Sequence, residues 1–192
     1  TVIDTAKYDY NAKTVEPGTP TAENQKAGYT YTFTGWGKKV AENVTEDATY
    51  KAEYTETANK DTKYTVEFYY QNKGVYPDKA DETVERTGTT DTEANVTSDD
   101  TTPTKAGYVF DKDNASNVVN ATIKGDGTTV LKVYFKQQFT VKFVNNGGTV
   151  IDTAKYDYNA KTVVPNDPIA ENQEAGFTYT FKGWDKTVAG NV

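Results

Sequence analysis

The stretch QFTVKFVNNGGTVIDTAKYDY, residues 138–158, decides the fold class of this chain. Apolar and polar residues alternate over residues 139–143, and this period of two is typical of a half-buried β-strand. Asn146, Gly147 and Gly148 follow as a turn signal, which predicts a hairpin. Residues 150–158 then provide its second strand. The stretch therefore predicts antiparallel β-structure.

The same alternation recurs along the chain, in GFTYTFKGW (176–184), ATYKAEYTET (48–57), KYTVEFYYQNKG (63–74) and TTVLKVYFK (128–136). ETVERTGTT (82–90) is a polar strand candidate, and AGYVFD (106–111) is a further segment of the same unit. In TTVLKVYFK, the residues Leu131, Val133 and Phe135 are predicted to face the core. Gly183, just before Trp184, is predicted to bulge its strand. No stretch carries a convincing helical stripe, so the chain is predicted to be mainly β.

A long internal repeat organises these strands. Residues 1–44 align with residues 149–192 without a gap at an offset of 148, and 34 of the 44 pairs are identical. This offset exceeds the roughly 20–50 residues of one solenoid repeat and is close to one large domain or two small ones. We expect the chain to be a window on a longer polymer with a 148-residue period.

Composition excludes several functional classes. The formal net charge of −7 argues against a nucleic-acid partner, which needs a basic surface to displace counterions from phosphates. The absence of Cys and His removes disulfides, thiol chemistry and the commonest general base and metal ligand. No apolar run reaches the ~20 residues of a membrane span, so no membrane insertion is predicted in this segment. The 33 Thr and 15 Tyr favour strands and suggest an extracellular bacterial protein.

One period is predicted to hold two modules. Residues 58–137 form one kind, and the other kind is present twice, as residues 1–57 without its first strand and as residues 138–192 without its last strand. The connection near residue 137 is very short, because the last strand of one module runs nearly straight into the first strand of the next. We therefore expect semi-rigid junctions and an elongated rod.

Two family resemblances follow from the quoted motifs. FTVKFVNNGGTVID, YTFKGW and ATYKAEY resemble the internalin B-repeat family, also called the Listeria–Bacteroides repeat. YTVEFYYQN, TPTKAGYVFD and GDGTTVLKVYFK in residues 58–137 resemble the mucin-binding-domain-like repeats of Gram-positive surface proteins. The resemblance implies tandem small β-grasp-like (ubiquitin-like) modules on a bacterial cell surface, in a cell-wall-anchored adhesin or fibre. It brings no catalytic motif and no cofactor.

Few residues suggest a specific chemistry. Asp111, Asp113 and Asn114, with Asp99 and Asp100 nearby, have the side chains of a calcium loop but lack its Gly and Glu positions, and a solvated turn is the favoured interpretation. Trp36 and Trp184 occupy equivalent positions and are predicted to pack in the core rather than on a sugar. The candidate ligand contacts are three tyrosines predicted to be exposed: Tyr69, Tyr76 and Tyr108. No catalytic, cofactor or metal residue is predicted, and the chain is not expected to be an enzyme.

Two functions remain open from the sequence. The first is a structural stalk or extracellular fibre, in which each module is stabilised by neighbouring repeats of the same chain. The alternative is adhesion, with the repeats binding mucin glycans or a host glycoprotein through multivalency. A third possibility joins the two, since unpaired strand edges could be completed by other copies of the chain.

Overall fold

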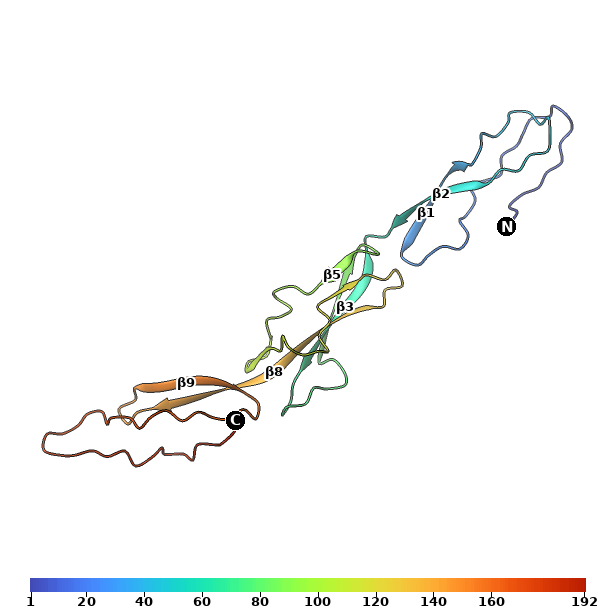
Figure 1. Cartoon of the computed structure of the whole chain (residues 1–192). Helices are drawn as coiled ribbons and strands as arrows, with labels where there is room; N and C mark the ends of the chain where they lie inside the picture. Colours follow the sequence, from blue (N-terminus) through green and yellow to red (C-terminus); the bar gives the residue numbers. More distant parts are fainter. The chain divides into compact units, whose positions relative to one another are not determined.

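The computed structural model describes residues 1–192 and contains β-strands but no helix (Figure 1). The mainly-β prediction is therefore confirmed. None of the chain forms a helix long and apolar enough to cross a membrane. The strands are β1 (Tyr29–Trp36), β2 (Ala52–Ala58), β3 (Thr62–Tyr70), β4 (Glu82–Gly88), β5 (Glu93–Asn95), β6 (Tyr108–Phe110), β7 (Asn120–Thr122), β8 (Thr129–Val144) and β9 (Val150–Asp157). They form three separate sheets: β1-β2, β4-β3-β8-β6 with β9 on β8, and β5-β7.

The chain divides into two compact units. The first holds residues 1–64, 86–94 and 122–129, and the second holds residues 65–85, 95–121 and 130–192. The module boundary predicted at 57/58 lies inside the first unit, and the one predicted at 137/138 lies inside the second. The division into modules itself stays a prediction, but both of its boundaries lie in compactly folded parts of the chain.

In the first unit, β1 and β2 pair antiparallel from Tyr29 opposite Ala58 to Trp36 opposite Ala52. The register shifts between Phe33 and Gly35, and Gly35 has φ 141°, which favours glycine. The bulge predicted for the Gly-Trp pair is thus present in this copy. The ring of Phe33 lies 5.4 Å from that of Trp36, so the half-buried Trp36 packs on its own strand.

The core of the second unit lies between β3 and β8. Leu131, Val133 and Phe135 are at most 1% exposed, which confirms the prediction from their alternation. Val66 is fully buried on β3, and the ring of Tyr70 stacks on that of Phe135 with centroids 4.8 Å apart. Burying each side chain of this size contributes roughly 1.5–3 kcal/mol relative to leaving it in water.

The predicted hairpin over residues 138–158 is also confirmed. β8 and β9 pair antiparallel from Gln138 opposite Asp157 to Val144 opposite Val150. The turn is closed by the Asn145 N–H, which donates to the Thr149 carbonyl at 2.8 Å. Gly148 has φ 97°, a conformation that the turn requires and that glycine adopts at little cost.

One predicted strand is wrong. Residues 177–184 have the alternation of a strand but form none, although the nearly identical residues 29–36 form β1. The two stretches differ in their partners: β1 pairs with β2, whereas no strand of the structure pairs with residues 177–184. Residues 1–9 likewise form no strand, whereas the equivalent residues 150–157 form β9 on β8.

Candidate functional site

The first candidate site is the connection between β2 and β3, in the first unit, where three residues join the two strands. The Asn59 N–H donates to the Gly28 carbonyl at 2.8 Å, and the Thr90 N–H donates to the Asn59 carbonyl at 2.9 Å. The Thr30 hydroxyl donates to the Asn59 side-chain oxygen at 2.7 Å. One asparagine thus ties β1 to the end of β4, on either side of the predicted module boundary.

Two glycines allow close backbone approach at this connection. A Cβ atom on Gly28 would lie 2.3 Å from the Gly125 Cα and 2.5 Å from the Thr90 hydroxyl oxygen. A Cβ atom on Gly125 would lie 1.8 Å from the Ala27 carbonyl oxygen. Any larger residue would push these segments apart. Gly176, the equivalent of Gly28 in the other copy, has no atom within 4 Å of such a Cβ.

A tyrosine strengthens the same connection. The Tyr29 hydroxyl donates a hydrogen bond to the Asp91 carboxylate. This bond, with a smaller contribution from desolvation, raises the pKa of Tyr29 above its ordinary value. Phe177 stands at the equivalent position of the other copy and has no hydroxyl group to donate.

The second candidate site is the connection within β8, in the second unit. β8 continues without a break through Gln137 and Gln138, where the sequence predicts a module boundary (Figure 1). The Gln138 N–H donates to the Gly107 carbonyl at 2.8 Å. The Gln137 side-chain oxygen accepts from the Lys73 N–H at 3.0 Å, and the Gln137 N–H donates to the Gln71 side chain at 3.2 Å. Loops from one predicted module therefore bind the boundary residues directly.

An ion pair joins the two strands just beside this boundary. The Lys136 ammonium lies 2.6 Å from the Asp157 carboxylate, where β9 ends. This hydrogen bond raises the pKa of Lys136 above its ordinary value. The Gln138 side-chain amide also donates to Asp157, at 3.3 Å. Both contacts hold the end of β9 against residues 136–138 of β8.

The structure places two of the three predicted ligand tyrosines in one aromatic cluster. Tyr69 stacks on Tyr134 with centroids 4.5 Å apart, and Tyr76 meets Tyr134 edge-on at 5.1 Å. Tyr69 is only 5% exposed, so the prediction that its side chain is exposed is wrong. The reason is that Tyr134 covers the face of β3 opposite the core. Tyr108 lies elsewhere, half-buried and edge-on to Tyr70 at 5.0 Å.

The hydroxyl groups of this cluster are already bound. The Tyr69 hydroxyl donates to Glu67 at 2.6 Å, and the Tyr76 hydroxyl donates to Asp111 at 2.7 Å. Burial, followed by these hydrogen bonds, raises the pKa of both tyrosines well above the ordinary value. The cluster connects β3, β8 and two loops, and this arrangement suits a structural support. Ligand binding by these tyrosines stays a prediction.

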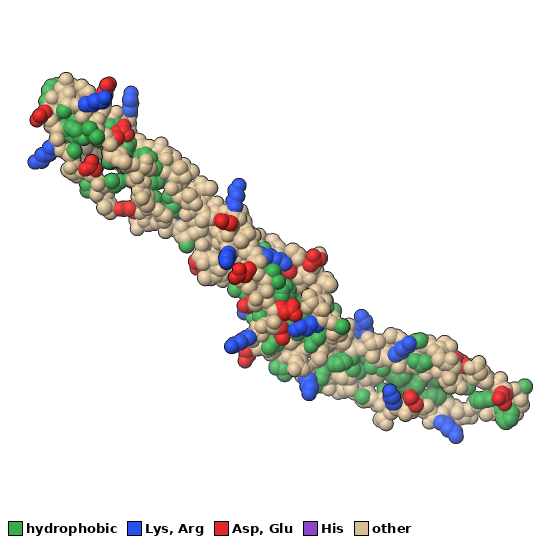
Figure 2. Space-filling view, turned by 180° about the vertical axis from the view of Figure 1, so that it is seen from behind, with side chains coloured by type: hydrophobic (Ala, Val, Ile, Leu, Met, Phe, Trp, Pro, Cys, Tyr) green, Lys and Arg blue, Asp and Glu red, His purple; other side chains and the backbone are tan.

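The acidic residues considered as a calcium loop are spread among separate partners. Asp111 binds Tyr76, Asp113 lies 3.4 Å from Lys112, and Asp100 accepts from the Thr97 N–H at 2.7 Å. No group of three His, Cys, Asp or Glu side chains in the structure could hold a metal ion. On the face shown in Figure 2, Lys and Arg side chains are interspersed with Asp and Glu.

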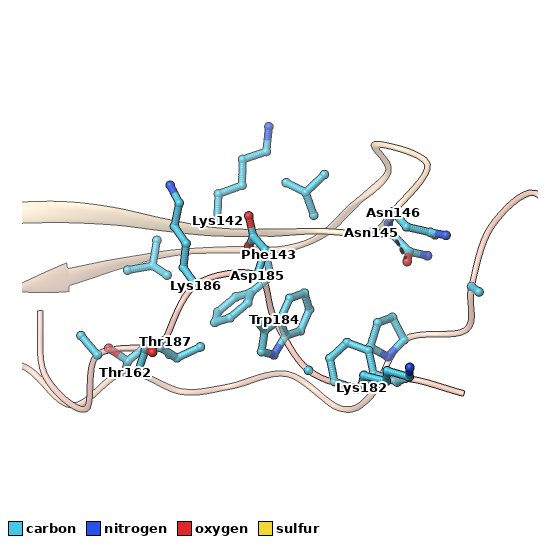
Figure 3. Close-up of a pocket in the computed structure, with 18 of the residues that line it drawn as sticks. Lys142, Phe143, Asn145, Asn146, Thr162, Lys182, Trp184, Asp185, Lys186 and Thr187 are labelled. Atoms are coloured by element: carbon cyan, nitrogen blue, oxygen red, sulfur yellow. Dashed lines mark hydrogen bonds between the residues drawn. The ribbon is translucent and has the colours of Figure 1, made fainter. Parts of the chain in front are cut away.

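A cleft of about 940 Å³ lies beside the β8–β9 hairpin, within the second unit. It is lined by Val141 and Phe143 from β8 and by residues 179–189 of the segment that forms no strand. The rings of Phe143 and Trp184 meet inside it at 4.7 Å (Figure 3). Trp184 is half-buried and packs on the apolar rings of Phe143 and Phe181.

Sequence reasoning missed the residues that bind across the predicted boundaries, namely Asn59, Gln71, Gln137 and the pair of Gly28 and Gly125. These are polar or glycine residues of loops, and no periodicity marks them. One signal was present: among the ten differences between the two copies, Tyr29 against Phe177 falls where one copy has a bonding partner and the other has none.

Compared with models of known protein families, with curated protein sequences and with solved structures, the chain has no match.

Proposed function

We propose that this chain is a structural repeat segment of a bacterial surface stalk or extracellular fibre, acting as a semi-rigid spacer. The observation that carries the proposal is that neither predicted module boundary contains a flexible linker. One boundary lies inside the unbroken strand β8, and the other lies between the last two residues of β2, with only three residues joining β2 to β3. A flexible linker would instead need a run of residues free of such contacts.

The boundary contacts support stiffness for a physical reason. Each boundary has backbone hydrogen bonds to loops on both sides, through Asn59 in one case and through Gln137 and Gln138 in the other. Bending there would break several bonds of about 0.5–1.5 kcal/mol each, together with the packing around them. Small modules that bury little of their own surface also gain stability from such neighbour contacts.

The 148-residue period supports a spacer in a second way. Near-identical copies allow the length of a stalk to change by whole periods without a change in its local structure. The resemblances noted above favour a location on the surface of a Gram-positive bacterium. We propose that the modules resemble a β-grasp fold in their strands. The helix of that fold is not part of the proposal, because the structure has no helix.

Adhesion through mucin glycans or a host glycoprotein is the alternative proposal. Its support is the sequence resemblance of residues 58–137. No feature of the three candidate tyrosines adds to it, since Tyr69 is buried and the hydroxyl groups of Tyr69 and Tyr76 are bound within the chain.

Stiffness can be tested by spin labels on a chain that has no native Cys. Asp47→Cys and Lys186→Cys place labels on exposed positions, and pulsed electron resonance gives the distribution of distances between them. We expect a narrow distribution that broadens when Gly-Ser-Gly is inserted between Gln137 and Gln138. The same insertion between the exposed residues Asp78 and Lys79 is the control and should leave it narrow. A broad distribution in the unaltered chain would contradict the proposal.

A further inference from the structure

Residues 65–70 of β3 and 130–137 of β8 belong to the second unit, where the two strands are neighbours in one sheet. Their contacts, in chain order, are Glu67 with Lys132, Tyr69 with Tyr134, Tyr70 with Phe135, and Lys73 with Gln137. Residue numbers rise together on the two sides, so the strands run parallel. The Gln71 N–H donates to the Phe135 carbonyl at 2.9 Å, one residue before its facing position, as a slanted parallel ladder requires.

This parallel pair is covered on both faces. On one face Val66, Leu131 and Val133 are fully buried. On the other face Tyr134 stacks on Tyr69, which is 5% exposed. β4 lies beside β3 and β6 lies beside β8, so neither strand is an edge of the sheet. Water therefore has little access to the hydrogen bonds between β3 and β8 and cannot readily replace them one by one.

The chain enters and leaves this pair at opposite ends. Residues 59–61 connect β2 to the start of β3. At the other end, β8 continues beyond the paired residues without a break to Val144. Because the two strands are parallel, the start of β3 and the end of the paired part of β8 lie far apart along the strand direction. Tension on the chain therefore pulls β3 one way and β8 the other way, along their own length.

The direction of the force decides how such a pair breaks. A force along two strands from opposite ends strains all the bonds between them at once, so these bonds must break together. A force that separates the strands from one end breaks the same bonds one after another. Since each bond contributes only about 0.5–1.5 kcal/mol, sequential breakage needs little force, whereas simultaneous breakage needs much more.

We propose that the β3–β8 pair is a tension clamp, which keeps residues 62–137 folded when the chain is pulled from its two sides. Its function is to pass a pulling force from one part of the chain to the next without unfolding. This goes beyond the spacer function, because a spacer resists bending and a clamp resists stretching. The proposal depends on the contacts between β3 and β8 and does not depend on the spacer function.

Polar contacts hold the register where the force leaves the clamp. The Gln137 N–H donates to the Gln71 side chain at 3.2 Å, and the Lys73 N–H donates to the Gln137 side chain at 3.0 Å. A slip of β8 by one residue along β3 would break both bonds. It would also turn Leu131 and Val133 away from the core, because successive side chains of a strand point to opposite faces. Sliding is thus opposed by packing as well as by hydrogen bonds.

Pulling the full chain in two directions with optical tweezers tests the clamp. The chain has no native Cys, so handles attach only to introduced ones. Lys60→Cys with Thr140→Cys pulls along the strands, whereas Lys60→Cys with Lys124→Cys pulls at the starts of both strands; all three positions are exposed. At one loading rate, we expect the unfolding force along the strands to be higher by about two-fold or more, because the bonds break together. Equal forces, or a lower force along the strands, would overturn the proposal.

A matched pair of substitutions tests the ladder itself. Gln71→Pro removes the N–H that binds Phe135 and also the Gln71 side chain, whereas Gln71→Ala removes the side chain alone. Gln71 follows the last residue of β3, so both variants are expected to fold, and urea unfolding checks this. Gln71→Pro should lower the unfolding force along the strands more than Gln71→Ala does. Equal forces for two folded variants would contradict a clamp built on this ladder.

Disulfide formation checks the parallel register. Glu67→Cys with Lys132→Cys places two thiols on facing residues, whose Cα atoms are about 4.8 Å apart in a sheet and within the range of a disulfide. An added oxidant should therefore link them readily. Glu67→Cys with Val130→Cys lies two residues out of register and should link far more slowly. Equal rates of linkage would overturn the register and the clamp with it.

The clamp and the spacer can fail separately. The spin-label experiment measures distances in an unloaded chain, and the tweezers measure the force needed to extend it. Equal unfolding forces in the two directions, with a narrow distance distribution, would overturn the clamp alone. A broad distance distribution, with a higher force along the strands, would overturn the spacer alone.

Discussion

Residues 1–44 and 149–192 are two copies of one sequence, and the structure folds them differently. Their local contacts agree closely. The Tyr8 hydroxyl binds the backbone of Val15 as the Tyr156 hydroxyl binds that of Val163. Isolated bridges pair Lys13 with Asn43 and Lys161 with Asn191. Contacts within the shared stretch therefore form in both copies.

The strands of the two copies do not agree. The first copy has β1 and no counterpart of β9, whereas the second copy has β9 and no counterpart of β1. Each strand is present only where its partner is present, since β1 pairs with β2 and β9 pairs with β8. Strand propensity is thus not sufficient at these positions, and the ladder partner decides the structure.

The largest expected difference between the copies concerns a glycine. Gly28→Ala should destabilise the first unit by about 3 kcal/mol, because the new methyl group meets the Gly125 backbone. Gly176→Ala has a similar positive φ but open space around it, so it should cost only about 1 kcal/mol. Urea unfolding of both variants measures this difference, and equal losses would show that backbone strain alone matters.

A matched pair of prolines tests the ladder. Asn59 donates to the Gly28 carbonyl, and by antiparallel alternation the Thr32 N–H also points to β2. Thr32→Pro should therefore cost about 2 kcal/mol. Thr180→Pro in the second copy should cost close to nothing, because residue 180 pairs with no strand. Thermal unfolding would detect the difference if it is followed by tryptophan fluorescence in variants that keep only Trp36 or only Trp184.

A smaller effect is expected from the Tyr29 hydroxyl group, which binds Asp91 and which Phe177 in the other copy lacks. The pKa of Tyr29 is raised in the folded chain, so its contribution is complete below the ordinary tyrosine pKa of about 10 and is lost as the pH rises above it. Tyr29→Phe should lower the unfolding midpoint at neutral pH and flatten this alkaline loss. Phe177→Tyr, at a position that is 68% exposed, should change neither quantity.

The smallest effect concerns the ion pair beside the β8 boundary. The pKa of Lys136 is raised, so the pair stabilises the fold below the ordinary lysine pKa and the effect is lost as the pH rises through the raised value. Asp157→Asn should cost about 0.5 kcal/mol after solvent screening, and less in high salt. Asp9→Asn, at the equivalent position with no β8 beside it, should be neutral. A loss that salt does not reduce would rule out a charge effect.

Much of the fold could be predicted from period-two alternation, because the first half of β8 buries every second side chain. Leu131, Val133 and Phe135 were identified in this way. The method failed for residues 177–184, whose alternation is intact, because a pattern records a face to be buried but not whether a partner strand is present. It also failed for Tyr69, because both faces of β3 are covered.

The candidate sites were harder to predict for a different reason. Asn59 and Gln137 act through backbone and amide hydrogen bonds between loops distant in the sequence, and such bonds leave no periodic signal. The Gly28–Gly125 approach depends on two backbones meeting. The sequence did indicate a short connection near residue 137. In the structure this connection is part of the continuous strand β8.

Amide hydrogen exchange of the unaltered chain tests the central claim most directly, since it reads both copies in one experiment. If the ladder partner decides the structure, alternate amides of residues 29–36 and 150–157 should be protected, while those of residues 177–184 and 2–9 should exchange freely. Equal protection of residues 29–36 and 177–184 would contradict this account, because the shared sequence would then form its strand without a partner.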